Sequence, residues 1–230
     1  MGIEPFLLVF IIAGMFFVQA GRALSEQLRD RLSFSLATVE GARQLADRQQ
    51  MSQGDGGRCW HSEHEGLRLE LHAEGYPARR IGRLLAEATG VRQRRIREDL
   101  GWLAPSILVL VWLPEPVAPR LLISQRPSVV PKVSRIPLHN PVLDQLLRVQ
   151  ASDPARARAL LAHEDVHGPL IELLGRHPLS VVTGEVVALW YCRAVADPQP
   201  LVDLALEVAG ALRLAAERLD RSLDPAVAAE

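Results

Sequence analysis

The longest apolar run of the chain lies at its N-terminus. The 17 residues from Pro5 to Gly21 carry no charge, and residues 6–18 are apolar throughout apart from Gly14. At ~1.5 Å per residue, a helix of this length reaches roughly 25 Å, which is close to the minimum for crossing the hydrocarbon core of a bilayer. The pattern therefore predicts a transmembrane anchor over residues 1–21.

Two interpretations of this segment stay open, because residues 18–20 also resemble the small-x-small cleavage site of a signal peptide. The residues before the span include Glu4 and no Lys or Arg, whereas Arg22, Arg29 and Arg31 follow it. The positive-inside rule then places the body of the protein in the cytoplasm. We expect a retained signal anchor and a single-pass membrane protein; a cleaved and exported form is the alternative.

An amphipathic pattern follows the anchor. Apolar residues recur at spacings of 4, 4, 4 and 3, and polar residues fill much of the other faces; they are Leu24, Leu28, Leu32, Leu36 and Val39. This predicts a stalk helix over residues 22–51. Its stripe at 24–39 lies on the body or the membrane surface, or it binds a protein partner or a second copy. The glycine-rich residues 52–57 predict a linker.

Strict alternation over residues 67–72 predicts a half-buried strand. Leucines form one side of it, and Arg68, Glu70 and His72 form the polar side. We expect this strand to pair with residues 58–63 across a turn at Glu65-Gly66.

Two further strands and a helix are predicted after this hairpin. The period of the apolar residues favours a helix over residues 78–89, with Ile81, Leu84, Leu85 and Ala88 on its buried side. The apolar run 107–113 is too short for a membrane span and predicts a buried strand, with residues 120–124 as its partner strand.

Prolines divide the body. Seven of them lie between Pro114 and Pro141, which predicts turns and extended chain. We therefore expect a Pro-rich connection over residues 127–141, between an N-terminal α+β subdomain (58–126) and a C-terminal one (142–221), with a tail at 222–230.

Asp-Pro pairs mark two helix starts in the C-terminal subdomain. Each of Asp153-Pro154 and Asp197-Pro198 ends a predicted strand, and each Asp is placed to cap a helix that Pro begins. The first helix is expected to run to Gly168-Pro169 and the second to about Asp220. A hairpin turning at residues 183–185 lies between them. The fold class predicted for the whole body is α+β, made of β-hairpins and packed helices behind a membrane anchor and stalk.

Residues 140–161, "NPVLDQLLRVQASDPARARALL", resemble a motif of a bacterial, membrane-associated domain of unknown function. Leu143 and Leu147 stand where that family prefers phenylalanine. The resemblance covers roughly residues 137–219 and implies the same strand, helix, hairpin and closing helix, together with membrane association. It implies no catalytic residues. The matching positions are core and cap positions by their own spacing: Val149, Asp153, Ala157, Leu160 and Leu161.

The composition excludes some classes of function but does not indicate a particular reaction. The formal net charge is −1 in 230 residues, so the net charge of the chain does not attract nucleic acid or an acidic partner. Cys59 and Cys192 form no CxxC pair or disulfide framework, so two buried thiols are expected. The chain contains no P-loop, dinucleotide fingerprint or G-x-S-x-G elbow. We expect no cofactor, and the small-molecule ligand, if there is one, is left open.

One motif spells out a chemistry. His163, Glu164 and His167 have the H-E-x-x-H form of a zinc protease, in which the two histidines bind the metal and Glu acts as general base. Gly168-Pro169 follows at once and is expected to end the helix as the second histidine arrives. We therefore expect no metal ligands or catalytic residues here, and a zinc metalloprotease is an alternative hypothesis.

A second motif suggests a helix-turn-helix over residues 78–100. Ala86, Gly90 and Ile96 occupy the relative positions of its small, turn and core residues. Asp99 stands where the helix-turn-helix motif has an apolar residue. The cluster of arginines at 92–97 could equally bind anionic lipid. We do not expect nucleic acid to be the partner, and membrane-tethered DNA binding remains an alternative. The sequence thus predicts a membrane-anchored, non-catalytic binding or scaffolding protein.

Overall fold

The structure is a computed structural model that describes residues 33, 35–54, 57–74, 79–89, 106–125 and 136–223. A helix covers residues 35–48, and we call it the docking helix. The strands are β1 (Ser52–Gln53), β2 (Cys59–His64), β3 (Leu67–Glu74), β4 (Ser106–Trp112), β5 (Leu122–Gln125), β6 (Leu147–Gln150), β7 (Val181–Thr183) and β8 (Val186–Tyr191). The other helices are α2 (Arg79–Thr89), α4 (Pro141–Leu146), α5 (Pro154–Leu161), α6 (Glu164–Arg176) and α7 (Gln199–Leu223).

All eight described strands join one antiparallel sheet in the order β1-β2-β3-β4-β8-β7-β5-β6. The α+β class predicted for the body is therefore confirmed. β4 pairs with β8, so strands from both predicted subdomains lie in the same sheet. Residues 52–53, which were expected in a linker, form the edge strand β1.

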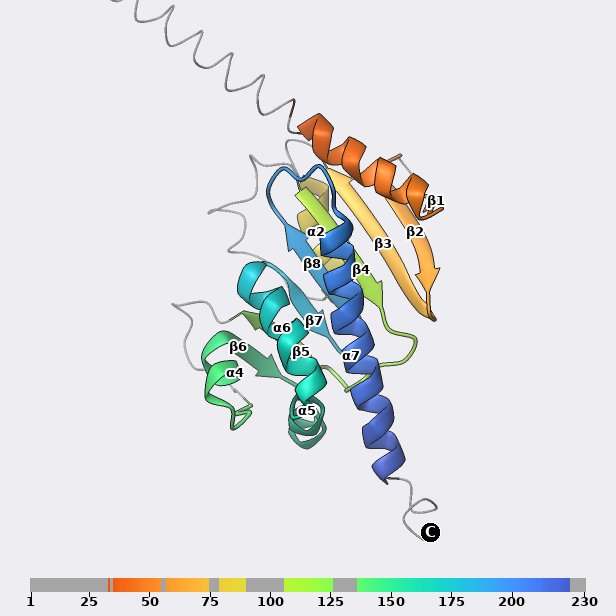
Figure 1. The fold of residues 1–230 in the computed structure, drawn as a ribbon. Coiled ribbons are helices and arrows are strands. Elements are labelled where there is room, and N and C mark those ends of the chain that lie inside the picture. Colours follow the sequence, from red (N-terminus) through yellow and green to blue (C-terminus); the bar gives the residue numbers. More distant parts are fainter. Residues whose placement is uncertain are drawn as a thin grey trace, which may run out of the picture.

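Helices cover the sheet on both sides. Figure 1 shows α7 running along the front of the sheet beside α6, while α2 lies behind it. The front layer, which includes the docking helix, encloses the larger core; α2 encloses a smaller one against β4 and β8. This division follows from the alternation of side chains along each strand.

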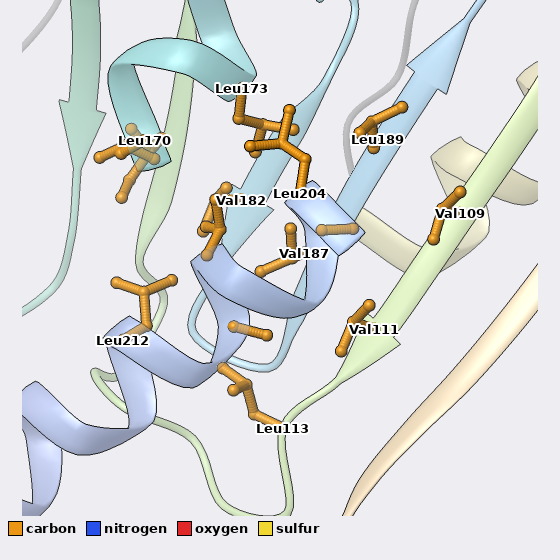
Figure 2. Close-up of a cluster of buried hydrophobic side chains, with 14 of the residues drawn as sticks. Val109, Val111, Leu113, Leu170, Leu173, Val182, Val187, Leu189, Leu204 and Leu212 are labelled. Carbon is orange, nitrogen blue, oxygen red and sulfur yellow. The ribbon is translucent and has the colours of Figure 1, made fainter. Parts of the chain in front are cut away.

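The centre of the larger core lies between α7 and the middle strands. Figure 2 shows Leu204 of α7 next to Leu173 of α6, within a cluster that also includes Leu212 of α7, Val187 of β8 and Val111 of β4. Each of these five side chains except Leu204 is at most 1% exposed. Because the apolar period of α7 matches the side chains that these strands present, this helix organises the front layer.

The docking helix is tied to the loop that follows β8. Thr38 is fully buried, and its hydroxyl accepts a hydrogen bond from Val195 N at 3.2 Å. Arg48 pairs with Asp197 at 2.8 Å. Gly41 permits close packing here, because a Cβ at this position would lie 2.0 Å from the carbonyl oxygen of Ala196. The helix is therefore fixed to the body along its length.

Of the predicted apolar stripe, only Leu36 and Val39 lie among the described residues, and Val39 packs against the core. Leu36 is 72% exposed and Val39 is half-buried, while the helix contributes Ala42, Leu45 and Ala46 to the core. Most of the described packing is therefore made by Ala42, Leu45 and Ala46, which lie beside the predicted leucine stripe on the helix surface. Leu24, Leu28 and Leu32, with the predicted anchor at 1–21, lie outside the described residues.

Several local predictions are confirmed. β2 and β3 pair across Glu65-Gly66, both of which have positive φ, as a tight hairpin turn requires. The helix at 79–89 buries Ile81 and Leu85 as expected. β7 and β8 form the hairpin that turns at residues 183–185.

The predicted partner of the strand at 107–113 is wrong. β5 does not pair with β4 but lies between β7 and β6. After β4 the chain is held against the β7–β8 turn, because Leu113 N donates to Glu185 O at 2.8 Å and Val117 N donates to Gly184 O at 2.9 Å. Because these bonds hold the segment after β4 against the β7–β8 turn, β5 begins on the far side of this hairpin, next to β7.

In the part of the chain that the structure describes, none of the helices has the length and apolar character needed to cross a membrane.

Candidate functional site

A row of polar side chains lies on the α2 side of the sheet along β3. Alternation places Arg68, Glu70 and His72 on this side, opposite the leucines that enter the larger core. The hairpin register sets Cys59 of β2 directly across from His72. We call Cys59, His72, Glu70 and Arg68 the thiol cluster.

The members of the thiol cluster contact one another in sequence. Cys59 Sγ lies 3.8 Å from His72 Nε2, and the same nitrogen lies 3.2 Å from a carboxylate oxygen of Glu70. The guanidinium of Arg68 donates to the other oxygen of Glu70 and lies over the ring of Trp112, 5.8 Å from its centroid. His72 is 6% exposed, and Cys59 is half-buried.

The electrostatics of the cluster favour charged forms. Burial acts to lower the pKa of His72, but hydrogen bonds and charge interactions with Cys59 and Glu70 outweigh it and raise that pKa to about 9. The hydrogen bond with His72 lowers the pKa of Glu70; burial opposes this, and Arg68 adds to it. At neutral pH the cluster therefore holds an imidazolium beside a carboxylate.

The geometry differs from that of a catalytic triad. In a triad, one nitrogen of the histidine faces the nucleophile and the other is oriented by a carboxylate. Here both Cys59 and Glu70 face Nε2 of His72. The other nitrogen, Nδ1, is buried and has no hydrogen-bond partner among the described residues. The arrangement therefore lacks the relay through both ring nitrogens that a triad uses between its nucleophile and its carboxylate.

Sequence reasoning missed this cluster. Alternation placed His72 on the polar side of its strand, but the structure buries it. Two signals could have found the cluster: a turn at Glu65-Gly66 requires residue 59 to face residue 72, and the next polar residue on the same side is Glu70. Cys59 was expected to be a buried thiol outside any disulfide; it is free, but it is half-buried rather than buried. The same holds for Cys192.

The predicted helix through the H-E-x-x-H motif is wrong. The helix that Asp153 caps ends at Leu161, and His163 has extended backbone at the N-cap of α6, without a side-chain cap. α6 then passes through Pro169. The proline removes one backbone donor at a cost of about 3 kcal/mol, which the burial of the apolar side of α6 offsets. Residues buried on that side are Val166, Leu170, Leu173 and Leu174.

This break separates the two histidines of the motif. His163 precedes α6, whereas His167 lies within it, with Nε2 donating to the carbonyl of Leu161 at 2.6 Å. A nitrogen that donates its proton to a carbonyl is not available to a metal. Asp165 pairs with Arg218 at 2.6 Å. Among the described residues, no group of three or more His, Cys, Asp or Glu side chains is placed to hold a metal ion.

Only the first helix of the predicted helix-turn-helix can be assessed. α2 begins at Arg79 and ends at Thr89, in agreement with that motif and equally with a helix packed on a sheet. Residues 90–105, with the arginines at 92–97, lie outside the described residues. DNA binding therefore stays an untested alternative.

A groove of about 840 Å³ lies where the β7–β8 turn meets the segment after β4. Gly184 makes this close approach possible, because a Cβ there would lie 2.2 Å from the carbonyl oxygen of Ala118. The lining is mixed, with prolines and leucines beside single charges of each sign. It includes Pro116, Pro119, Arg120, Leu121, Thr183 and Glu185. Its volume falls within the range of small-molecule sites, but its lining is less apolar than theirs usually is.

The chain matches no protein-family model, no curated protein and no solved structure. The resemblance of residues 140–161 to a membrane-associated domain therefore remains a prediction. In residues 137–219 the structure has β6, α5, the β7–β8 hairpin and α7, with α4 and α6 as helices that the resemblance did not imply.

The charged state of His72 predicts a pH dependence of stability. Its folded pKa of about 9 exceeds the ordinary histidine pKa of 6.5, so its contribution is complete below pH 6.5 and is lost as the pH rises to about 9. We expect the free energy of unfolding in urea to fall by about 2 kcal/mol over this window. In His72→Gln the fall should be absent.

His61→Gln is the matched control for this measurement. His61 lies on the neighbouring strand opposite Glu70 and is exposed. The His61→Gln protein should lose stability between pH 6.5 and 9 as the wild type does. An identical pH profile for wild type and His72→Gln would show that His72 is neutral in the folded protein.

Proposed function

We propose that this protein is a single-pass membrane protein whose cytoplasmic α+β body binds or scaffolds a protein partner, without catalysis of its own. The observation that carries the proposal is the docking helix. It lies within the predicted stalk (22–51), which follows the uncharged residues 5–21, and it is fixed to the body by Thr38, Gly41 and Arg48. A helix held in this way would transmit the orientation of the anchor to the body.

The position of the groove supports a binding role. The docking helix contacts the loop after the last residue of β8, whereas the groove includes Gly184 and Glu185, just before its first residue. β8 spans five residue steps, or roughly 17 Å at ~3.3 Å per residue. The groove would therefore face away from the bilayer, toward partners in the cytoplasm.

The leucine stripe offers a second contact surface. Leu36 is 72% exposed although it belongs to a helix that packs closely on the body. Leu24, Leu28 and Leu32 precede it at four-residue spacing in the sequence, which supports a face on which a protein partner or a second copy of the chain packs within or near the membrane surface.

Membrane partition tests this proposal. The full chain expressed in a bacterial host should sediment with membranes and resist extraction at alkaline pH. Ile12→Lys combined with Phe16→Lys should move most of the chain to the soluble fraction, because a lysine at the centre of a span strongly disfavours insertion. Ile12→Leu with Phe16→Leu is the matched control and should stay in the pellet. A wild-type chain found in the soluble fraction, or shortened by cleavage after Ala20, would contradict the proposal.

A further inference from the structure

The two sides of the sheet are covered unequally. On the front, α7 contributes buried side chains to the larger core along its length, from Leu201 to Ala216. Behind the sheet (Figure 1), the described side chains of α2 that enter the smaller core are those of Ile81 and Leu85, with Leu84 and Ala88 partly buried beside them. Because stabilisation by burial scales with the apolar surface removed from water, α2 is held to the sheet much less strongly than α7.

The α2 helix has little stability of its own. It is 11 residues long, with no acidic residue in its first turn and no basic residue in its last turn. Glu87 instead lies near its C-terminus, where the helix dipole disfavours a negative charge. An isolated helix of this length is marginal in water. The formation of α2 therefore depends on its contact with the sheet.

The surface beneath α2 includes polar atoms that remain without partners. Trp190 of β8 belongs to the smaller core, and Trp112 of β4 packs against that core. The indole nitrogens of both side chains are buried, and neither has a hydrogen-bond partner among the described residues. A buried donor without a partner costs free energy, because in water it would be hydrogen-bonded. The docking of α2 is therefore opposed by groups on the surface that it covers.

The two ends of α2 have different neighbours. Near its start, the backbone N–H of Ile81 donates to a carboxylate oxygen of Glu74 on β3 at 3.0 Å. At its end, Ala88 and Thr89 line the groove of about 840 Å³, together with the β7–β8 turn and the segment after β4. The last residues of α2 thus form one wall of the groove, and the hydrogen bond to β3 lies near the opposite end of the helix.

We propose that α2 is a detachable wall of the groove, which undocks from the sheet while the sheet and the front layer stay folded. Undocking withdraws Ile81 and Leu85 from the sheet and gives the indole N–H groups of Trp112 and Trp190 access to water. The groove then extends onto the sides of β4 and β8 that α2 covers. The use of this opening in binding rests on the proposed function, whereas undocking itself does not depend on the membrane anchor.

Native-state hydrogen exchange of the full-length protein in detergent, resolved by peptide mass spectrometry, tests this inference. Relative to their intrinsic rates, the amides of α2 should exchange at least about a hundredfold faster than those of α7. The amides of β4 and β8 should stay protected, because these strands remain paired with each other in the sheet. Exchange of α2 as slow as that of α7, or exchange of β4 and β8 together with α2, would overturn the proposal.

Leu212→Ala distinguishes local opening from unfolding of the whole body. Leu212 is buried beneath α7, so its truncation destabilises the docked and the undocked form of α2 equally relative to the unfolded chain. The exchange of α7 should therefore accelerate about a hundredfold or more, while that of α2 should change by less than about twofold. Equal acceleration in both helices would show that α2 opens only when the body unfolds, and the proposal would be wrong.

Two substitutions within α2 separate undocking from fraying in place. Leu85 is fully buried, whereas the adjacent Leu84 is half-buried. Leu85→Ala should accelerate the exchange of α2 at least about thirtyfold, because undocking no longer has to expose this side chain. Leu84→Ala is the matched control and should accelerate it by less than about fivefold. If Leu85→Ala has no larger effect than Leu84→Ala, the helix exchanges without leaving the sheet.

Urea below the unfolding transition makes the same distinction without a substitution. Unfolding of the whole body exposes far more surface than undocking of one short helix, so urea should accelerate the exchange of α7 much more than that of α2. An equal urea dependence in the two helices overturns the proposal even if Leu212→Ala does not fold. Membrane partition tests the proposed function separately, so a failure of either one is recognised by itself.

Discussion

Replacing Leu212 by alanine is expected to lower the free energy of unfolding by about 3 to 4 kcal/mol. Leu212 is fully buried at the centre of α7, where Figure 2 places it within the cluster that joins this helix to β4 and β8. Truncation removes the apolar surface that the leucine buries and leaves a cavity that well-packed neighbours fill only in part. Urea unfolding of the full chain followed by circular dichroism measures the change.

Leu214 is the control on the same helix. It lies two residues further along, on the opposite side of the helix, and is 45% exposed. The same truncation therefore removes less buried surface. Leu214→Ala should change the free energy of unfolding by less than about 1 kcal/mol. If the two variants are equally destabilised, α7 does not pack on the sheet by the side described here.

The second large effect is expected at Gly184. Replacement by alanine places a Cβ 2.2 Å from the backbone oxygen of Ala118, and neither partner is the flexible end of a side chain. The clash pushes the β7–β8 turn away from the segment that hydrogen-bonds to it through Val117 N and Leu121 O. We expect a loss of about 3 kcal/mol or more, measured as for Leu212.

Gly210→Ala separates this clash from a general effect of removing glycine. Gly210 lies in the middle of α7, and a Cβ there meets nothing within 4 Å. Alanine should therefore stabilise the protein by about 0.5 to 1 kcal/mol, because it lowers the backbone entropy of the unfolded chain. A Gly184→Ala protein as stable as wild type would contradict the close approach that shapes the groove.

Local features of this fold could be predicted from the sequence because they depend on residues close together in the chain. The turn at Glu65-Gly66 fixes the register of β2 and β3, and Asp153-Pro154 starts α5 with the side chain of Asp153 accepting from Ala155 N and Arg156 N. The buried run at β4 follows from its apolar length. Each of these signals acts within about ten residues.

Long-range pairing could not be predicted in the same way. The placement of β5 between β7 and β6 depends on hydrogen bonds from the segment after β4 to the β7–β8 turn, more than 60 residues further along the chain. Pro169 was expected to end a helix, but burial on α6 outweighs the lost donor, and the break comes earlier at Ala162 and His163. To predict the thiol cluster, one would have had to know both the register of β2 and β3 and that His72 is buried. Alternation alone predicts only the side of the strand on which His72 lies.

The central claim of the proposed function is that the body lies on the cytoplasmic side of the membrane. Intact spheroplasts that contain the full chain are treated with an external protease, and the same treatment is repeated after lysis. We expect the body to stay intact in sealed spheroplasts and to be cleaved only after lysis, because the positive-inside rule, applied to the arginines at 22, 29 and 31, predicts a cytoplasmic body. Digestion of the body in sealed spheroplasts, or its recovery outside them in a shortened form, would contradict the proposal.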